Sequence, residues 1–432
     1  MANPISYLKF SSDDGFDDIP VYSISDFPNS PLRIMTSDGI GCINLVPPSL
    51  SNSLRVMTDD GIKGIDTELA YSLPALDIRT VVYMKDNKMV SNHNNSLHLS
   101  EDGGLTFTKS MPIGAEVGTV KYLHIFSDGT LLFCSNSKGY YSTDFISYTE
   151  STILDIDGSP IVLTGVDNLN VFNHDRKTQI VDGIEMLVWG NYTNIAYVPI
   201  RVWYTVDKGR TIKIAYEFNV AGSNAATHVH NLIFNSADSS FWILTGDYFP
   251  PEPRPQSHFM QCFYDTVNDS WTFETIGSSL PHKAGQMVFY GEYAYWNWDT
   301  TDGGVIRCKY DEIGDITKYE QLFQTPNDCL DILMSDKGEL IVTQSFYGGS
   351  DDSRYIWYSP DRVTFHKILT NPDITWNANT CYFGLRGPNK DGRVLAGIAN
   401  NLIHTTATWD LTPTIFLDEY VRKAGFPNAF KP

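Results

Sequence analysis

The chain has 432 residues, of which 13% are aromatic and only 19% are charged, with 32 glycines and 22 prolines. Its formal net charge of −20 comes from 31 basic against 51 acidic side chains, and such a field repels phosphate backbones and anionic membranes, which argues against a nucleic-acid-binding or membrane-surface protein. No segment contains a run of about 18 consecutive apolar residues, which a membrane-spanning helix would need. No segment shows sustained helical periodicity. The composition is typical of many short strands joined by turns, so we expect an all-β fold without membrane insertion.

The first 76 residues differ from the rest of the chain. After an acidic, turn-rich start, residues 32–40 (LRIMTSDGI) recur 22 positions later as residues 54–62 (LRVMTDDGI). Each copy predicts a strand, a turn containing Asp-Gly and a second short strand. Because two hairpins of this size bury little core alone, we expect residues 1–76 to dock on another protein of a larger assembly.

A longer period begins at residue 77. Apolar openings, most of them followed by a polar turn and a second apolar strand, recur at residues 79–83, 121–126, 161–163, 228–234, 285–290, 328–333 and 380–385. Residues 77–415 then correspond to about 48 residues per repeat for seven repeats or about 56 for six, and propeller blades usually have roughly 40–50. We therefore predict a seven-bladed β-propeller, with six blades as the alternative and an inserted loop or extra hairpin near residues 160–220. We expect residues 416–432 to form a tail with one short helix that ends near Gly425.

A hairpin turn at residues 100–107 (SEDGGLTF) recurs along this second part of the chain. In it Asp102 can accept hydrogen bonds from backbone N–H groups, and two glycines supply positive φ angles. Two further copies keep the Asp and the Thr, and a weaker copy surrounds Asp144. The pattern Ser-x-Asp-x-Gly-x-Thr-aromatic resembles the Asp-box, or BNR repeat, of sialidase-like β-propellers, and this resemblance implies a structural turn rather than an active site. The residues that carry it are Ser100, Asp102, Gly104, Thr106, Phe107, Asp207, Gly209, Thr211, Ser359, Asp361, Thr364 and Phe365.

The duplicated hairpin in residues 1–76 resembles N-terminal segments of bacteriophage tail proteins. This resemblance implies a virion component that is oligomeric within its assembly. The first residues, MANPIS, have neither the basic region nor the apolar region of a signal peptide, and six scattered cysteines without a C-x-x-C pair indicate free thiols in a reducing compartment. We expect a virion protein made in the host cytoplasm, with a cytoplasmic protein as the alternative.

The sharpest local signal for a ligand site is the sequence His-Val-His at residues 228–230. In a strand His228 and His230 fall on one face, and Asp247 follows the next strand. Two histidines and a carboxylate suit a divalent transition metal, but histidines hydrogen-bonded in a structural role explain the same pattern. We therefore predict no cofactor and keep a metal at His228 and His230 as the alternative. Nearby aromatic rings can stack on sugars, and the candidate channel or ligand site comprises His228, His230, Asp247, Trp296, Trp298 and Asp299.

The sequence carries the motifs of sialidase chemistry only incompletely. The resemblance to that family implies three arginines around a carboxylate, a Tyr–Glu nucleophile pair and an acidic residue. Arg79 lies where the first arginine would fall, but its context, IRTV, lacks the Arg-Ile-Pro of that family. We predict no catalytic residues and a structural or binding component of a virion or tail-like assembly, with the propeller as a platform for a protein or a cell-surface glycan. The alternative is a glycan-active enzyme, a sialidase-like hydrolase or a metal-dependent lyase, with its site at the channel mouth, because propellers host both roles.

Overall fold

The computed structural model divides the chain into two compact units, Met1–Leu76 and Asp77–Pro432. No helix in the described part of the chain is long and apolar enough to cross a membrane. The structure describes residues 6–12, 15–21, 32–36, 39–43, 54–58 and 61–65, and residues 81–431 except 94, 105, 119, 136, 165–168, 170–178, 194–197, 220–224, 247–256, 301–302, 326–328, 345–354, 371–379 and 401–413.

The first unit contains two antiparallel sheets. Strands β1 (Ser6–Ser12) and β2 (Gly15–Val21) pair with each other. Strands β3 (Leu32–Thr36), β4 (Gly39–Ile43), β5 (Leu54–Thr58) and β6 (Gly61–Ile65) form a four-stranded sheet in chain order. The predicted doublet is therefore two hairpins, in which Thr36 is opposite Gly39 and Thr58 is opposite Gly61, joined by pairing of β4 with β5.

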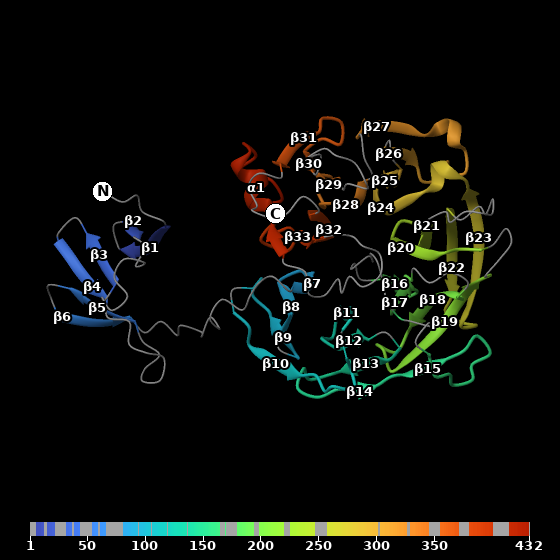
Figure 1. The fold of residues 1–432 in the computed structure, drawn as a ribbon, viewed down its shortest axis with the longest axis horizontal. Helices are drawn as coiled ribbons and strands as arrows, with labels where there is room; N and C mark the ends of the chain where they lie inside the picture. The colour runs from blue at the N-terminus through green and yellow to red at the C-terminus, as the bar shows by residue number, and fades with distance from the viewer. Residues whose placement is uncertain are drawn as a thin grey trace. The chain divides into compact units, whose positions relative to one another are not determined.

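The second unit is a seven-bladed β-propeller, as predicted. Seven sheets follow one another around a ring, and the inner strand of each sheet, which is its first strand in all but the third, faces the middle of the ring (Figure 1). These inner strands are β7 (Val81–Lys85), β11 (Tyr122–Ile125), β16 (Gln179–Val181), β20 (His228–Asn235), β24 (Ala284–Tyr290), β28 (Cys329–Met334) and β32 (Thr380–Arg386). Six of the seven predicted openings overlap these strands, because alternating β-branched and aromatic residues mark a strand that is packed on both sides.

The remaining strands complete each sheet from the inside outwards. Second strands are β8 (Lys88–His93), β12 (Leu131–Cys134), β17 (Ile184–Gly190), β21 (Ser240–Gly246), β25 (Tyr293–Trp298), β29 (Leu340–Gln344) and β33 (Leu395–Asn400). Third strands are β9 (Ser96–Ser100), β13 (Gly139–Ser142), β18 (Ile200–Thr205), β22 (His258–Asp265), β26 (Gly304–Lys309), β30 (Tyr355–Ser359) and β34 (Thr414–Phe416). Fourth strands, in the first six sheets, are β10 (Lys109–Pro112), β14 (Thr149–Glu150), β19 (Thr211–Phe218), β23 (Ser270–Ser278), β27 (Glu320–Gln324) and β31 (His366–Thr370).

The third sheet corrects one prediction. Residues 161–163, expected to open the third blade, form no strand, and the Val162 side chain is 91% exposed. The chain first adds β15 (Thr152–Leu154) in parallel to β19, at the outer edge of the sheet, and reaches the inner edge only at β16. The apolar triplet misleads because Ile161 and Leu163 pack against the core cluster between the second and third sheets without being in a strand.

The ring closes between the seventh and first sheets. Strand β32 lies beside β7, and Met84, Met89 and Leu395 form a small buried cluster there. After β34 the predicted C-terminal helix, α1 (Leu417–Lys423), follows, and Gly425 has a φ of +105°. Leu417 and other residues of this tail pack into the cluster between the sixth and seventh sheets.

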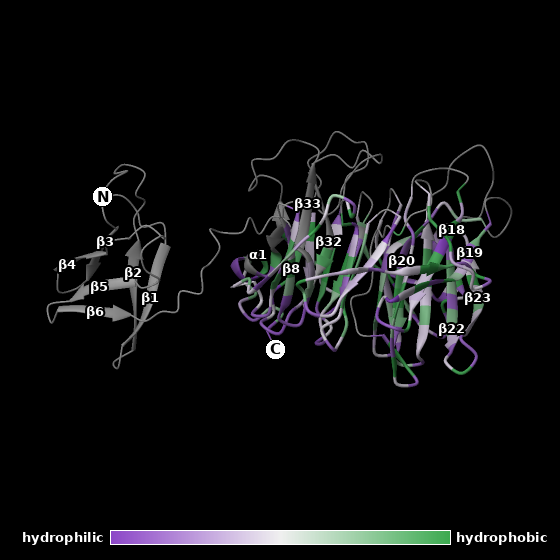
Figure 2. Cartoon of the chain, turned by 90° about the horizontal axis from the view of Figure 1, so that it is seen from below, coloured by the Kyte–Doolittle hydropathy of each residue, from purple (hydrophilic) through white to green (hydrophobic). Residues whose placement is uncertain are grey.

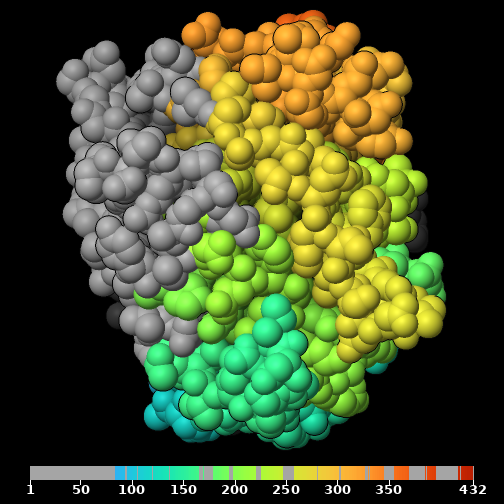
Figure 3. Space-filling view, turned by 90° about the vertical axis from the view of Figure 1, so that its right-hand side faces the viewer, coloured from blue at the N-terminus to red at the C-terminus, as the bar shows by residue number. Residues whose placement is uncertain are grey.

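The hydrophobic core is divided among the seams between sheets. Each of the seven seams has its own buried cluster, and the one between the third and fourth sheets is the largest. From outside, the third to sixth sheets lie side by side (Figure 3). Large side chains such as Trp203, Trp242 and Trp296 are fully buried, so most of the aromatic content serves packing between blades.

The propeller has two distinct faces. The inner strands begin at one face, here named the entry face. They end at the other, named the turn face, where the third strand also turns into the fourth in the first six sheets, because successive strands are antiparallel. Apolar residues follow the strands between the faces, and hydrophilic residues gather in the turns along the lower edge (Figure 2).

Candidate functional site

Four hairpin turns on the turn face share one hydrogen-bond arrangement. In the first, the Asp102 carboxylate accepts from the Thr106 N–H at 2.9 Å and from the Thr106 and Ser100 hydroxyls at 2.5 and 2.7 Å. The Ser100 oxygen in turn accepts from the Gly104 N–H at 2.8 Å. A Cβ on Gly104 would lie 2.8 Å from the sulfur of Met89, and its φ is +90°, so this position requires glycine.

The other three turns repeat this arrangement around Asp144, Asp207 and Asp361. Each carboxylate accepts from a hydroxyl two residues earlier and from a backbone N–H three or four residues later. The residue after each Asp has a positive φ in all four turns, although only the first is a glycine: Gly103 at +74°, Phe145 at +59°, Lys208 at +62° and Arg362 at +66°.

Two of these carboxylates, Asp144 and Asp361, are held in their charged form. The N–H groups of Ser147 and Ile146 lower the pKa of Asp144 to about 2, and those of Thr364 and Val363 do the same for Asp361. A carboxylate bound by its own turn is poorly placed to exchange a proton with a ligand. The turns therefore order the hairpins. Gly209 (φ +86°), Thr211 and the partly buried Phe107 lie within two of them, and Phe365 stacks on Phe323 with ring centroids 4.5 Å apart.

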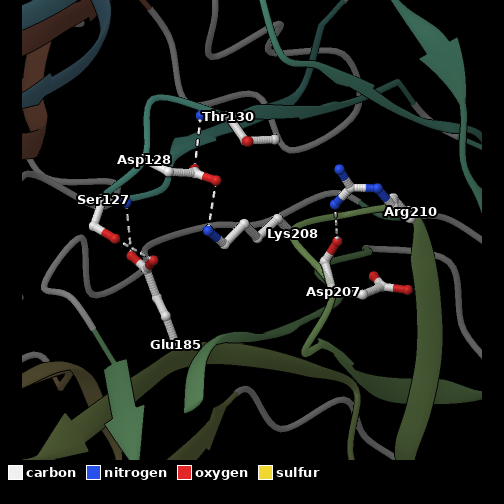
Figure 4. A network of polar contacts seen from close by, with 7 residues as sticks. All are labelled: Ser127, Asp128, Thr130, Glu185, Asp207, Lys208 and Arg210. Carbon is white, nitrogen blue, oxygen red and sulfur yellow. Dashed lines mark hydrogen bonds and ion pairs between the residues drawn. The ribbon is translucent and has the colours of Figure 1, made fainter. Parts of the chain in front are cut away.

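One polar network on the turn face joins two sheets (Figure 4). The Lys208 ammonium lies 2.5 Å from the Asp128 carboxylate, which belongs to the turn after the second inner strand. The neighbouring Ser127 donates from its N–H and its hydroxyl to Glu185, at 2.8 and 2.5 Å. This network links the second sheet to the third, and its side chains are exposed or half-exposed.

The candidate ligand site lies on the entry face. His228 and His230, at the start of β20, are buried, and their rings stack with centroids 4.8 Å apart. The Tyr192 ring, from the segment after β17, stacks on His228 with centroids 4.2 Å apart and lies 6.5 Å from the His230 ring. Three aromatic rings from two sheets thus form one group of stacked rings, and Tyr192 is its only partly exposed member.

Backbone carbonyls set the tautomer of both histidines. Nδ1 of His228 lies 3.0 Å from the Thr193 carbonyl oxygen, and Nδ1 of His230 lies 2.8 Å from that of Ala284. A carbonyl oxygen only accepts, so Nδ1 is the protonated nitrogen of each neutral ring. These two bonds tie the fourth sheet to the third and to the fifth, respectively.

A charged pair borders the stack. The Asp299 carboxylate, whose side chain is 11% exposed, lies 3.3 Å from the Lys283 ammonium and 3.8 Å from Nδ1 of His230. The Asp299 N–H also donates to the Lys283 carbonyl at 3.1 Å, so the two residues hold each other where β24 begins and β25 ends. An aromatic stack beside one anion and one cation can bind a polar ring compound through stacking and hydrogen bonds.

Close packing fixes the position of His230. It stands at an irregularity in the pairing of β20 with β21, between Val229 and Asn231, and bulges of this kind redirect a side chain. A Cβ added to Gly246 would overlap the His230 ring, so the ring occupies the space that any other residue at 246 would fill. Gly246 is therefore part of the site through its lack of a side chain.

The structure brings only some of the predicted site residues together. It brings together His228, His230 and Asp299, and Trp298 pairs with Ala284 at the edge of this cluster. Trp296 is instead fully buried between the fourth and fifth sheets. Asp247 lies outside the described residues. Among the residues that are described, no three His, Cys, Asp or Glu side chains come close enough to hold a metal ion.

Sequence reasoning missed Tyr192, Lys283 and Gly246 as members of this cluster. Tyr192 and Lys283 stand 36 and 55 residues from His228, so only the ring of sheets brings them there. Two of the arginines that could have served a sialidase site are ion-paired elsewhere: Arg201 with Glu217 at 2.7 Å and Arg307 with Glu320 at 2.5 Å.

Comparisons with known proteins assign the chain to no family. No family model and no curated protein matches the chain. Among solved structures, it is similar to the WD40 β-propeller domain of Doa1, with 14% identity over 79% of this chain and 92% of that one, at a TM-score of 0.45. The CNH domain of AfRom2 gives 10% identity over 74% and 90% of the two chains, at 0.42. The extracellular domain of a putative one component system from B. thetaiotaomicron gives 10% identity over 91% of this chain, at 0.44, and the chain spans 52% of its length.

Proposed function

We propose that this protein is a non-enzymatic binding component of a virion or tail-like assembly. In this proposal residues 1–76 attach the chain to other proteins, and the propeller presents its entry face to a cell-surface glycan. We also propose that the four hairpin turns are Asp-boxes, because the same hydrogen bonds recur around Asp102, Asp144, Asp207 and Asp361.

The observation that carries the glycan-binding proposal is the Lys283–Asp299 pair beside the stack of Tyr192, His228 and His230. A sugar ring has an apolar face that stacks on Tyr192, and hydroxyls that donate to Asp299 and accept from Lys283. Both histidine Nδ1–H groups are already bonded to the backbone, which supports recognition by a preformed site rather than proton transfer.

Glycan-array binding by the full chain tests this function. The Tyr192→Ala variant should bind the retained glycan about tenfold more weakly or worse. Tyr293→Ala is the matched control, because Tyr293 is also partly buried but lies at the turn face, where β25 begins. Equal loss in both variants, or no glycan bound by the wild type, would overturn the proposal, and shortened products would support the glycan-active enzyme instead.

The assembly part of the proposal has its own test. Particles purified from the organism that encodes the chain should contain it in stoichiometric amount, measured by quantitative mass spectrometry of the particle fraction. Recovery of the chain only among unassembled proteins would contradict a virion role while leaving the glycan result standing.

A further inference from the structure

The two hairpins of the first unit are equivalent in register as well as in sequence. Strand β3 pairs with β4 from Leu32 opposite Ile43 to Thr36 opposite Gly39. Strand β5 pairs with β6 from Leu54 opposite Ile65 to Thr58 opposite Gly61, which is the same set moved by 22 residues. Each hairpin is therefore one copy of the same structural unit.

The two copies are joined edge to edge. Strand β4 of the first hairpin pairs antiparallel with β5 of the second, with Ile43 opposite Val56. Since β5 is the counterpart of β3, this contact joins the second strand of one copy to the first strand of the next. The chain therefore already contains one example of how two such hairpins associate.

The outer edges of the sheet offer the same contact again. In the described part of this unit, β3 pairs only with β4, and β6 pairs only with β5, while β2 lies near β3 without pairing with it. The sequence of β3, LRIMT, differs from that of β5, LRVMT, by one residue, and β6, GIKGI, keeps the first glycine and both isoleucines of β4, GIGCI. Unpaired edges of this kind are templates for pairing with another chain.

We propose that a second copy of this chain pairs with the first through these edges, β6 of one copy against β3 of the next. The contact equivalent to Ile43 opposite Val56 is then Ile65 opposite Ile34 of the second copy. This inference rests on the proposed role of residues 1–76 as an attachment segment, and it identifies a second copy of the chain as the protein to which that segment attaches. Such an interface is head-to-tail, so it generates a closed ring or an open filament rather than a two-fold dimer.

The pattern along the strands supports this pairing. Opposite positions in an antiparallel pair share a face, as do positions two residues apart. By these rules one face of the sheet carries Lys63, opposite Val56, and six branched aliphatic positions, which a second copy in the proposed register would continue: Leu32, Ile34, Ile43, Leu54, Val56 and Ile65. A four-stranded sheet gains stability when such a face is extended and covered.

Sedimentation of the full chain tests the proposal, because the proposed interface joins two different edges of the sheet. Wild-type protein should associate as its concentration rises, whereas Ile34→Lys and Ile65→Lys should each sediment as monomers, because either lysine places a charge directly in the proposed Ile65–Ile34 cross-strand pair. A one-to-one mixture of the two variants should form a dimer and stop there, since only one intact β6 edge and one intact β3 edge remain. Ile34→Val and Ile65→Val are the controls and should behave as the wild type does.

Disulfide trapping provides a second measurement that does not depend on loss of association. A chain with both Ile34→Cys and Ile65→Cys should give a ladder of covalent oligomers on oxidation, because directly opposite strand residues have Cα atoms within disulfide range. Ile34→Cys with Lys63→Cys, displaced by two residues, should not, and the wild type gives the background of native cysteines.

Three results would overturn the proposal: a wild-type chain that stays monomeric at every concentration, a single lysine variant that still associates with itself, or a ladder that is no stronger than the displaced control. Glycan binding by the propeller is measured separately on the same variants. Failure of self-association with glycan binding intact would reject this interface and leave the proposed function standing.

Discussion

The two faces of the propeller use polar groups in opposite ways. On the turn face, each of four carboxylates is bound within its own hairpin, to donors no more than four residues away. On the entry face, the hydrogen bonds of His228 and His230 span 35 and 54 residues and connect the fourth sheet to its two neighbours. Local bonds define each blade, whereas bonds between blades assemble the candidate site, so the two faces should respond differently to substitution.

The largest effect is expected at the entry face, from Gly246→Ala. The added methyl group overlaps the His230 ring, which is held by the Ala284 carbonyl and cannot turn away without breaking that bond. Overpacking of this kind costs about 1–3 kcal/mol. We expect the free energy of unfolding, measured in urea, to fall by about 2 kcal/mol.

The matched control is Gly314→Ala. This glycine lies between the third and fourth strands of the fifth sheet, on the turn face, and a Cβ there would make only an ordinary contact with Ile276 at 3.6 Å. The free energy of unfolding of the Gly314→Ala variant should therefore change little. Equal losses at both positions would show that the entry face has no special packing around His230.

A smaller effect is expected from Asp361→Ala on the turn face. The substitution removes the acceptor for the N–H groups of Thr364 and Val363 and for the Thr364 hydroxyl. An exposed side chain that accepts backbone N–H bonds at a helix end stabilises by about 1 kcal/mol, and we expect a similar loss here. Asp361→Asn keeps an acceptor oxygen and should lose less in the same urea experiment, and an alanine variant as stable as the wild type would remove the structural role of the turn.

The bound carboxylates also predict how stability depends on pH. The pKa values of Asp144 and Asp361 are lowered from 3.8 to about 2 in the folded protein. The contribution of these two carboxylates to the free energy of unfolding is therefore fully present above pH 3.8 and is lost as the pH falls through 2. Thermal melting of Asp144→Asn/Asp361→Asn should show a flatter decline between about pH 4 and pH 2 than the wild type, and parallel curves would assign the acid sensitivity to other groups.

Much of the fold could be predicted because it is encoded locally. The hairpin doublet, six of seven inner strands and the Asp turns each depend on residues close in sequence, such as Ser100 with Asp102. The third blade was misplaced because its first strand, β15, belongs to the outer edge of the sheet, and no local pattern distinguishes an edge added in parallel from an inner strand. The left-handed residues after the aspartates were also unexpected, since Lys208 and Arg362 occupy positions where turn chemistry favours glycine.

The candidate site could be predicted only in part, for the opposite reason. His228 and His230 were recognisable because period-2 spacing places them on one face of a strand. Their relation to Tyr192 and Lys283 depends on how neighbouring sheets pack around the ring, which one sequence does not reveal. Trp296 was grouped with Trp298 because the two are close in sequence, yet it belongs to the core while Trp298 is partly exposed.

The smallest effect is expected at Lys208. Its ion pair joins two sheets on the turn face, so the polar contacts of that face are not all local to one hairpin (Figure 4). Its ion pair with Asp128 is solvent-accessible, with side chains 29% and 45% exposed, so Lys208→Ala should cost only about 0.2–1 kcal/mol and still less in high salt. Lys208→Gly loses the same ion pair but removes the backbone strain at a φ of +62°. A left-handed conformation costs an L-residue about 1–2 kcal/mol. The glycine variant should therefore be more stable than the alanine variant in urea. If alanine were instead the more stable, backbone strain would be negligible in this turn, and the link between sheets would be the main contribution of Lys208.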